Sequence, residues 1–80
     1  MTVVRVRLFA ALREEAGASV VESEGATAGE VADAVSARYG GRFARIAAAG
    51  SLVVNGERAG RDTPVVDGDE VALLPPVSGG

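Results

Sequence analysis

The feature that most constrains the fold is a single apolar stripe of helical spacing over residues 28–39. From Val31 onward, apolar residues recur at spacings of three and four, the pattern of an amphipathic helix. Thr27 and Glu30 match a capping box: the Thr27 hydroxyl can accept from the Glu30 amide while the Glu30 carboxylate reaches back to the Thr27 amide. The pair Gly40-Gly41 supplies a stop signal. We therefore expect one main helix over residues 28–39.

Short segments with strand-like patterns flank this helix on both sides. The first of them alternates Val and Leu with Arg, which is the two-residue period of a strand with one buried and one solvated face. The others are rich in Val and Leu or adjoin a turn signal. We expect strands over residues 4–8, 19–23, 51–54, 57–58 and 70–74.

Turn and helix signals account for the remaining segments. Asn55-Gly56 is typical of a type I′ turn, because both residues accept positive φ angles. Asp67-Gly68-Asp69 is a second turn cluster. Residues 10–16 predict a short helical turn with Gly17 as a left-handed C-cap, and residues 42–49 predict a second short helix.

The order strand, strand, helix, strand, strand, strand indicates an α+β domain. A helix that crosses between strands allows two strands to run parallel in one sheet. The economical arrangement is a mixed four- to five-stranded sheet with one main helix packed on one face, which is the β-grasp (ubiquitin-like) fold. We expect residues 1–76 to form this domain and residues 77–80 to form a flexible C-terminal tail.

Composition excludes several functional classes. The 80 residues contain neither cysteine nor histidine, which removes thiol catalysis, disulfides, the usual zinc ligands and imidazole acid–base chemistry. The sequence also lacks a Ser/His/Asp set and a phosphate-cradling loop. We therefore expect a protein that is not itself an enzyme and that holds no metal.

Charge and hydropathy limit the partners. The formal net charge is −3, with 11 acidic and 8 basic residues, and the basic residues are interleaved with acidic ones. Such a distribution lacks the basic patch that binds a phosphate backbone, so nucleic acid is not an expected partner. No apolar run approaches the ~20 residues that span a bilayer, so we expect no membrane association and a cytoplasmic location.

The C-terminal end carries the most specific signal. Pro75 and Pro76 have no amide hydrogen for a strand ladder and hold the backbone near polyproline II, so the sheet should end at Leu74. The two residues that follow Ser78 are Gly79 and Gly80, and neither has a Cβ. A terminal Gly-Gly alone is a weak signal, but Asp-Gly-Asp-Glu-Val, two prolines and a terminal Gly-Gly in that order are strong together.

With this C-terminus in view, the sequence resembles the MoaD-type small subunit of molybdopterin synthase, one of the MoaD/ThiS-like, ubiquitin-related sulfur carriers. The matching pieces are RLFAALRE from Arg7 to Glu14 with Gly17, the segment Val53-Asn55-Gly56, and DGDEVALLPPVSGG from Asp67 to Gly80.

The resemblance implies a chemistry at Gly80. An E1-like adenylating enzyme would use ATP to activate the Gly80 carboxylate, and a sulfur donor would then replace AMP to leave a thiocarboxylate. The tail, with Gly79 allowing it to thread, would enter a catalytic large subunit and donate sulfur for the dithiolene of molybdopterin. The chain itself would bind no cofactor, and the catalytic residues would lie in the large subunit.

The residues that precede the terminal glycines are candidate partner contacts. Strand alternation turns one of the two leucines 73 and 74 outward, and an exposed leucine beside the tail is a candidate docking residue. The predicted partner-binding set is Leu73, Leu74, Pro75, Pro76, Val77 and Ser78. The chain departs from the family pattern at Leu73-Leu74, where aromatic residues often precede the prolines, and at Ser78, where Thr is common.

Other functions share these features. A carrier for cysteine synthesis would share nearly all of them, whereas thiamine-branch carriers tend to be shorter and lack the Pro-Pro-Val tail. A ubiquitin-like modifier would use the same adenylation and end in an isopeptide bond to a target lysine. Because all 8 basic residues are arginine, this chain could not form side-chain-linked polymers of itself and would be at most a single tag. A binding module with an inert tail is the remaining alternative.

Overall fold

The alternating N-terminal pattern forms strand β1 (Val3–Leu8) in the computed structural model, which describes residues 2–77. Val4, Val6 and Leu8 are buried, whereas the two arginines between them are exposed. The two-residue period of the sequence therefore separates a core face from a second face of the sheet, as predicted.

Helix α1 (Ala10–Ala16) reverses the chain after β1, and strand β2 (Val20–Glu24) returns antiparallel to it. Gly17 ends the helix with a φ of 72°, and its amide donates to the carbonyl of Arg13 at 2.9 Å. This left-handed conformation favours glycine and confirms Gly17 as the predicted C-cap. Strand β2 begins one residue later than predicted.

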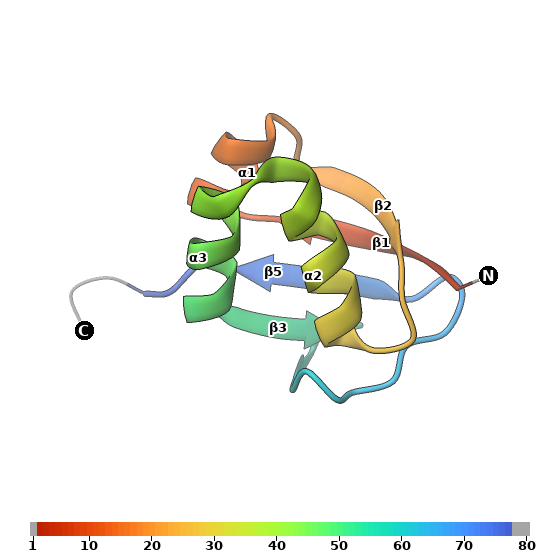
Figure 1. Cartoon of the computed structure of the whole chain (residues 1–80). Coiled ribbons are helices and arrows are strands. Elements are labelled where there is room, and N and C mark those ends of the chain that lie inside the picture. Colours follow the sequence, from red (N-terminus) through yellow and green to blue (C-terminus); the bar gives the residue numbers. More distant parts are fainter. Residues whose placement is uncertain (1, 78–80) are drawn as a thin grey trace.

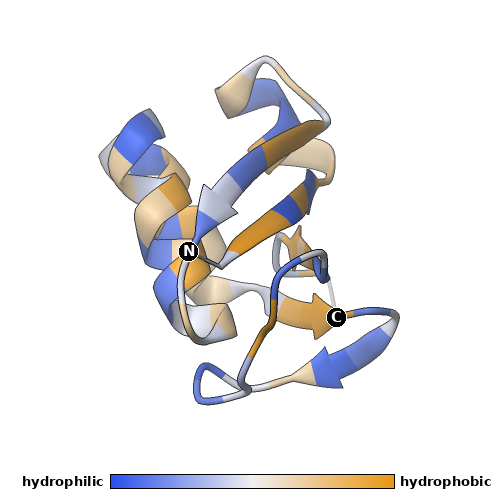
Figure 2. Ribbon diagram, turned by 90° about the vertical axis from the view of Figure 1, so that its right-hand side faces the viewer, coloured by the Kyte–Doolittle hydropathy of each residue, from blue (hydrophilic) through white to orange (hydrophobic). Residues whose placement is uncertain are grey.

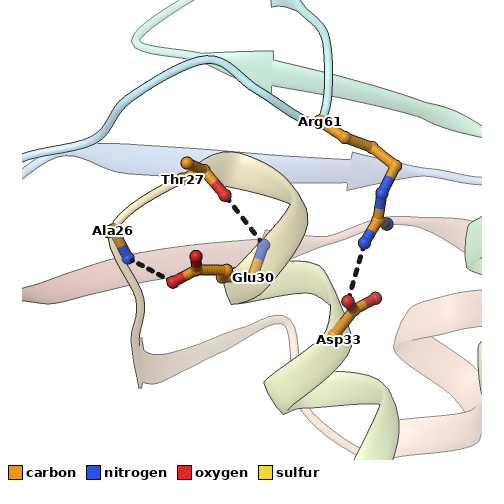
Figure 3. Close-up of polar contacts among 5 residues, drawn as sticks. All are labelled: Ala26, Thr27, Glu30, Asp33 and Arg61. Carbon is orange, nitrogen blue, oxygen red and sulfur yellow. Dashed lines mark hydrogen bonds and ion pairs between the residues drawn. The ribbon is translucent and has the colours of Figure 1, made fainter.

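The main helix α2 (Ala28–Tyr39) begins directly after Thr27, the predicted capping residue. The Thr27 hydroxyl accepts from the Glu30 amide at 3.2 Å, as a capping box requires (Figure 3). The return contact differs from the prediction: the Glu30 carboxylate accepts from the amide of Ala26 at 3.0 Å, not from that of Thr27. Thr27 itself lies in an isolated β-bridge with Pro64, which joins the start of the helix to a distant segment.

A second helix, α3 (Gly41–Ala49), follows α2 after one residue, which confirms the short helix predicted for this segment. Gly40 has a φ of 96° and turns the chain at the end of α2. Gly41, expected as part of the stop, is the first residue of α3, because the single left-handed residue already breaks the first helix. Phe43 is fully buried, and its ring centroid lies 5.3 Å from that of Tyr39.

The remaining strands are β3 (Ser51–Val54), β4 (Glu57–Ala59) and β5 (Glu70–Leu74). Asn55 and Gly56 have φ angles of 49° and 86°, the positive values that the predicted type I′ turn requires. The five strands form one sheet in the order β2-β1-β5-β3-β4, in which only β1 and β5 run parallel. The sheet is thus mixed, with β5 at its centre.

The three helices cover one face of this sheet (Figures 1 and 2). Figure 2 shows hydrophobic and hydrophilic residues alternating along β1, and the hydrophobic residues Val4, Val6 and Leu8 of this strand lie in the core. No helix within residues 2–77 is long and apolar enough to cross a membrane. The core between helices and sheet consists of Val4, Val6, Leu8, Leu12, Ala28, Val31, Ala32, Val35, Phe43, Val65, Val71 and Leu73.

Candidate functional site

The chain leaves the domain from the central strand of the sheet. β5 is hydrogen-bonded to β1 on one side and to β3 on the other, and it ends at Leu74. Pro75, Pro76 and Val77 then have no regular structure, and Val77 is 91% exposed. In Figure 1 the segment after β5 points away from the body of the domain, on the side opposite the N-terminus. A strand held on both sides gives the base of the tail a fixed origin.

The structure separates the two leucines at the end of β5. Leu73 is only 1% exposed and belongs to the core, so the prediction that it contacts a partner is wrong. Leu74 is partly exposed, because successive side chains of a strand point to opposite faces. Leu74 is therefore the leucine that remains available for docking.

Phe9 lies beside Leu74, although its role was not predicted. In the parallel ladder Leu8 is opposite Leu73, and Phe9, the extended residue that follows β1, therefore comes level with Leu74, the last residue of β5. Phe9 has an extended backbone and is 36% exposed, which places it on the same face as Leu74. The signal that could have identified it is the parallel register, which only the folded sheet provides.

Two further small apolar residues extend this surface across the sheet. Ala72 precedes Leu74 by two residues on the same face, and Val53 of β3 is opposite Ala72 in the antiparallel ladder. Both are half-buried. We call the four residues Phe9, Val53, Ala72 and Leu74 the docking patch.

Arginine side chains flank the docking patch. Arg7 of β1 is opposite Ala72, and its guanidinium lies 3.8 Å from the carboxylate of Glu70. Arg58 of β4 is opposite Val53 and donates to the Ser51 hydroxyl at 3.5 Å. An apolar strip between two exposed cations suits a partner surface that is apolar at its centre and acidic at its rim.

The turn before β5 uses its acidic side chains to hold the backbone. Asp67 accepts from the Val3 amide at 2.9 Å. Asp69 accepts from the Val66 amide at 2.8 Å and from the Asn55 side chain at 3.0 Å, and these two hydrogen bonds lower the pKa of its carboxyl group. Within residues 2–77, no group of three possible ligands could hold a metal ion. This cluster is a structural turn.

A separate hollow lies on the helical side, away from the docking patch. It is a groove of about 510 Å³ between α2 and α3, lined mainly by alanine and glycine. The charged groups beside it, Asp33 and Arg61, pair with each other at 2.6 Å (Figure 3), and Asp33 thereby raises the pKa of Arg61. The described part of the groove thus offers small apolar surface and one satisfied ion pair, not a catalytic set.

Three residues of the predicted site are Ser78, Gly79 and Gly80, and they lie outside the described residues. Their assigned roles as partner contact, threading residue and sulfur-bearing residue stay predictions. What residues 2–77 add is the origin of the tail and the surface beside it.

This architecture places the chain in the class of β-grasp, ubiquitin-like domains: a mixed five-stranded sheet, helices on one face, and a C-terminus that leaves the central strand. The sequence profile of the ThiS family matches residues 6–80. The chain therefore belongs to the ThiS family of small ubiquitin-like sulfur carriers.

Solved structures agree with this assignment. The small archaeal modifier protein SAMP1 from Haloferax volcanii is 32% identical, over 98% of this chain and 99% of its own, with a TM-score of 0.81. A chain of the BexX/CysO complex of Amycolatopsis orientalis is 34% identical over 96% and 99%, with a TM-score of 0.78. A putative molybdopterin converting factor subunit 1 from Pyrococcus furiosus is 28% identical over 96% and 100%, with a TM-score of 0.83.

Proposed function

We propose that this protein carries sulfur as a thiocarboxylate on Gly80 and delivers it for dithiolene formation in molybdopterin. The observation that supports this most directly is the exit of the chain from β5, through two prolines, into solvent at Val77. Pro75 and Pro76 restrict φ, so less entropy is lost when a partner captures the tail. Membership of the ThiS family supports the same chemistry.

The carrier chemistry proceeds in two steps. The Gly80 carboxylate attacks the α-phosphate of ATP on an E1-like activating enzyme, and pyrophosphate leaves as the acyl-adenylate forms. A sulfide-level donor, such as hydrosulfide, then attacks the activated carbonyl carbon, and AMP leaves, so that the carboxyl end is a thiocarboxylate. The carrier contributes a carboxyl group without neighbouring bulk, because glycine has no Cβ.

Sulfur transfer itself would take place in the partner. We propose that the docking patch rests on the large subunit of molybdopterin synthase while the tail enters its active site. Phe9 and Leu74 provide apolar contact area next to the origin of the tail, and Arg7 and Arg58 provide charge at its rim. The resemblance of Asp67 to Gly80 to the MoaD-type terminus and the likeness to the converting factor of Pyrococcus furiosus favour this branch.

A second candidate is a sulfur carrier for thiamine or cysteine biosynthesis. The 34% identity to a chain of the BexX/CysO complex favours a carrier other than that of molybdopterin synthase. Protein modification is the third candidate, favoured by the 32% identity to SAMP1. The absence of lysine from this sequence limits that role to single tags.

Intact mass spectrometry tests the carrier chemistry. Protein incubated with ATP, a sulfur donor and an activating enzyme should gain about 16 Da, the difference between sulfur and oxygen, and the gain should require Gly80. An unchanged mass with every activating enzyme tried would contradict the carrier function. A Gly-Gly remnant on lysines of other proteins would support modification instead.

The branch is tested with chemically prepared thiocarboxylate. Cleavage of an intein fusion by sulfide places the thiocarboxylate on Gly80 without any activating enzyme. This material should convert the sulfur-free pterin precursor to the dithiolene when a molybdopterin synthase large subunit is added. Failure with the large subunit, together with support of cysteine or thiazole formation, would move the protein to another carrier branch.

A further inference from the structure

Gly50 makes a backbone-to-backbone contact at the base of the tail. It lies between α3 and β3, and its amide donates to the Ala47 carbonyl at 3.1 Å, ending the helix. The next residue, Ser51, is opposite Leu74 in the antiparallel ladder, so Gly50 comes level with Pro75. The start of β3 and the origin of the tail therefore meet at this glycine.

The contact leaves no room for a side chain. A Cβ at Gly50 would lie 1.8 Å from the carbonyl oxygen of Leu74, 2.9 Å from its carbonyl carbon and 3.1 Å from Cα of Pro75. All three are backbone atoms, so no change of rotamer could relieve the overlap. The φ of Gly50 is −95°, which any residue can adopt. Glycine is therefore required at this position for steric reasons, because a side chain would overlap the backbone at the base of the tail.

A shift at this contact would be passed into the base of the tail. Pro75 fixes its own φ near −65° and confines Leu74 to extended backbone, and Pro76 repeats the restriction. A small rotation at Leu74 therefore changes the direction in which the chain leaves the sheet and reaches Val77.

We infer that Gly50 is a positioning residue for sulfur transfer: its missing side chain lets β3 begin against Leu74 and Pro75, and this contact sets the direction in which the tail leaves the sheet. The inference rests on the proposed carrier function. Gly50 acts through Leu74 and the locked φ of Pro75.

The test compares Gly50→Ala with a matched control. Gly60→Ala makes the same substitution where a Cβ would meet nothing within 4 Å. Each protein is loaded chemically as the Gly80 thiocarboxylate and assayed with a molybdopterin synthase large subunit. Gly50→Ala should lower turnover by about 10²-fold, the order expected for a displacement of about 1 Å at a reacting group, with a smaller change in KM. Gly60→Ala should match the wild type.

A double-mutant cycle separates positioning from a loss of fold. Pro75→Ala frees φ at the base of the tail, so it should lower turnover by a smaller factor and leave the thermal midpoint nearly unchanged. In the double variant the combined loss of turnover should be less than the product of the two single losses, because both substitutions alter the direction in which the tail leaves the sheet. If Gly50 had a purely structural role, the loss of turnover in the double variant would equal the product of the two single losses. The loss of turnover would then also follow the fall in the thermal midpoint.

The outcomes decide between the two proposals. Wild-type turnover by folded Gly50→Ala would overturn the positioning role and leave the carrier function standing. If Gly50→Ala does not fold, Pro75→Ala decides, since wild-type turnover by that variant would mean that direction at the base is unimportant. Wild-type thiocarboxylate that transfers sulfur to no acceptor would overturn the carrier function, and the positioning role with it.

Discussion

The side chain of Asn55 and the carboxylate of Asp69 join the β3–β4 hairpin to the turn before β5. Nδ2 of Asn55 donates to Asp69 at 3.0 Å, while its Oδ1 accepts from the Glu70 amide at 2.9 Å. Asp69 also accepts from the Val66 amide at 2.8 Å. The central strand that bears the tail is therefore anchored at its beginning by a small network around one carboxylate.

Asp69 should make stability depend on acidic pH. The Val66 amide and then the Asn55 side chain lower its pKa in the folded state, so the charged form stabilises the fold at pH values above the unfolded pKa of about 3.9. That contribution is lost as pH falls through the folded pKa. Asp69→Asn should lower the thermal midpoint at pH 7, and the difference from wild type should shrink below pH 4. Asp62→Asn, which removes an exposed charge outside this network, should show no such trend.

The capping residue of α2 should contribute measurably to stability. Thr27→Ala removes the acceptor of the Glu30 amide and should cost about 1 kcal/mol, or roughly 4–8 °C in thermal midpoint for a domain of this size. Thr27→Ser keeps the hydroxyl and is the matched control. Urea unfolding followed by circular dichroism measures both. Equal midpoints for the two variants would show that the hydrogen bond is not what Thr27 contributes.

Local patterns predicted the elements because each depends on residues close in sequence. The alternation of β1, the capping residue Thr27 and the Asn55-Gly56 turn are all such cases. The return contact of the capping box differs by one residue from the prediction, because the Glu30 carboxylate accepts from the Ala26 amide and not from that of Thr27. The segment of residues 60–65 packs against the start of α2 through backbone hydrogen bonds that no local pattern announces.

Gly29 illustrates this dependence and gives a prediction. The amide of Gly29 donates to the Arg61 carbonyl at 3.0 Å, and an added Cβ would lie 2.9 Å from that oxygen. Gly29→Ala should therefore destabilise the protein, although alanine is the better helix former by up to about 1 kcal/mol. Gly41→Ala in the first turn of α3 meets only the end of the Arg45 side chain at 3.6 Å and should be neutral or stabilising. Chemical denaturation of both variants tests the contrast.

The candidate site was only partly predictable for the same reason. The tail signal lies in consecutive residues, so the resemblance that implies a carrier chemistry could be recognised from Asp67 to Gly80. Phe9 and Gly50 gain their significance from strands that are distant in sequence, because the parallel ladder brings one to Leu74 and the antiparallel ladder brings the other to Pro75. Alternation predicted that one of the two leucines faces outward, but only burial in the fold identified it as Leu74.

Substitution of the two leucines by aspartate should separate folding from binding. Leu73→Asp places an unpaired charge in the core, at a cost of several kcal/mol against a total of about 5–15, and should unfold the domain. Leu74→Asp should stay folded but weaken binding to the large subunit. Circular dichroism and calorimetric titration measure the two effects. Val66→Asp is the control, because Val66 is exposed and lies in the turn before β5, at the end of that strand opposite the tail. Normal binding by folded Leu74→Asp would remove the docking patch from the interface.

The last prediction concerns the bulk that the terminal residues can carry. If the carboxyl end passes from an activating enzyme to a catalytic subunit, it must fit the channels of both proteins. An added side chain can therefore clash in either channel. Gly79→Val adds three carbon atoms and a β-branched, stiff side chain next to the reacting group. Ser78→Thr adds one methyl group and restores the residue common in MoaD-type termini. Gly79→Val should therefore abolish turnover, whereas Ser78→Thr should keep most of it.

The step that Gly79→Val blocks can be identified by changing how the thiocarboxylate is made. Enzymatic loading, measured by intact mass, shows whether the variant fits the channel of the activating enzyme. Chemical loading, followed by an assay of dithiolene formation, shows whether it fits the channel of the large subunit. Because Val77 is already exposed and the core ends at Leu73, neither substitution should move the thermal midpoint. Full activity of Gly79→Val in both assays would show that the tail meets no narrow channel, and the carboxyl group would then have to be reached from an open surface.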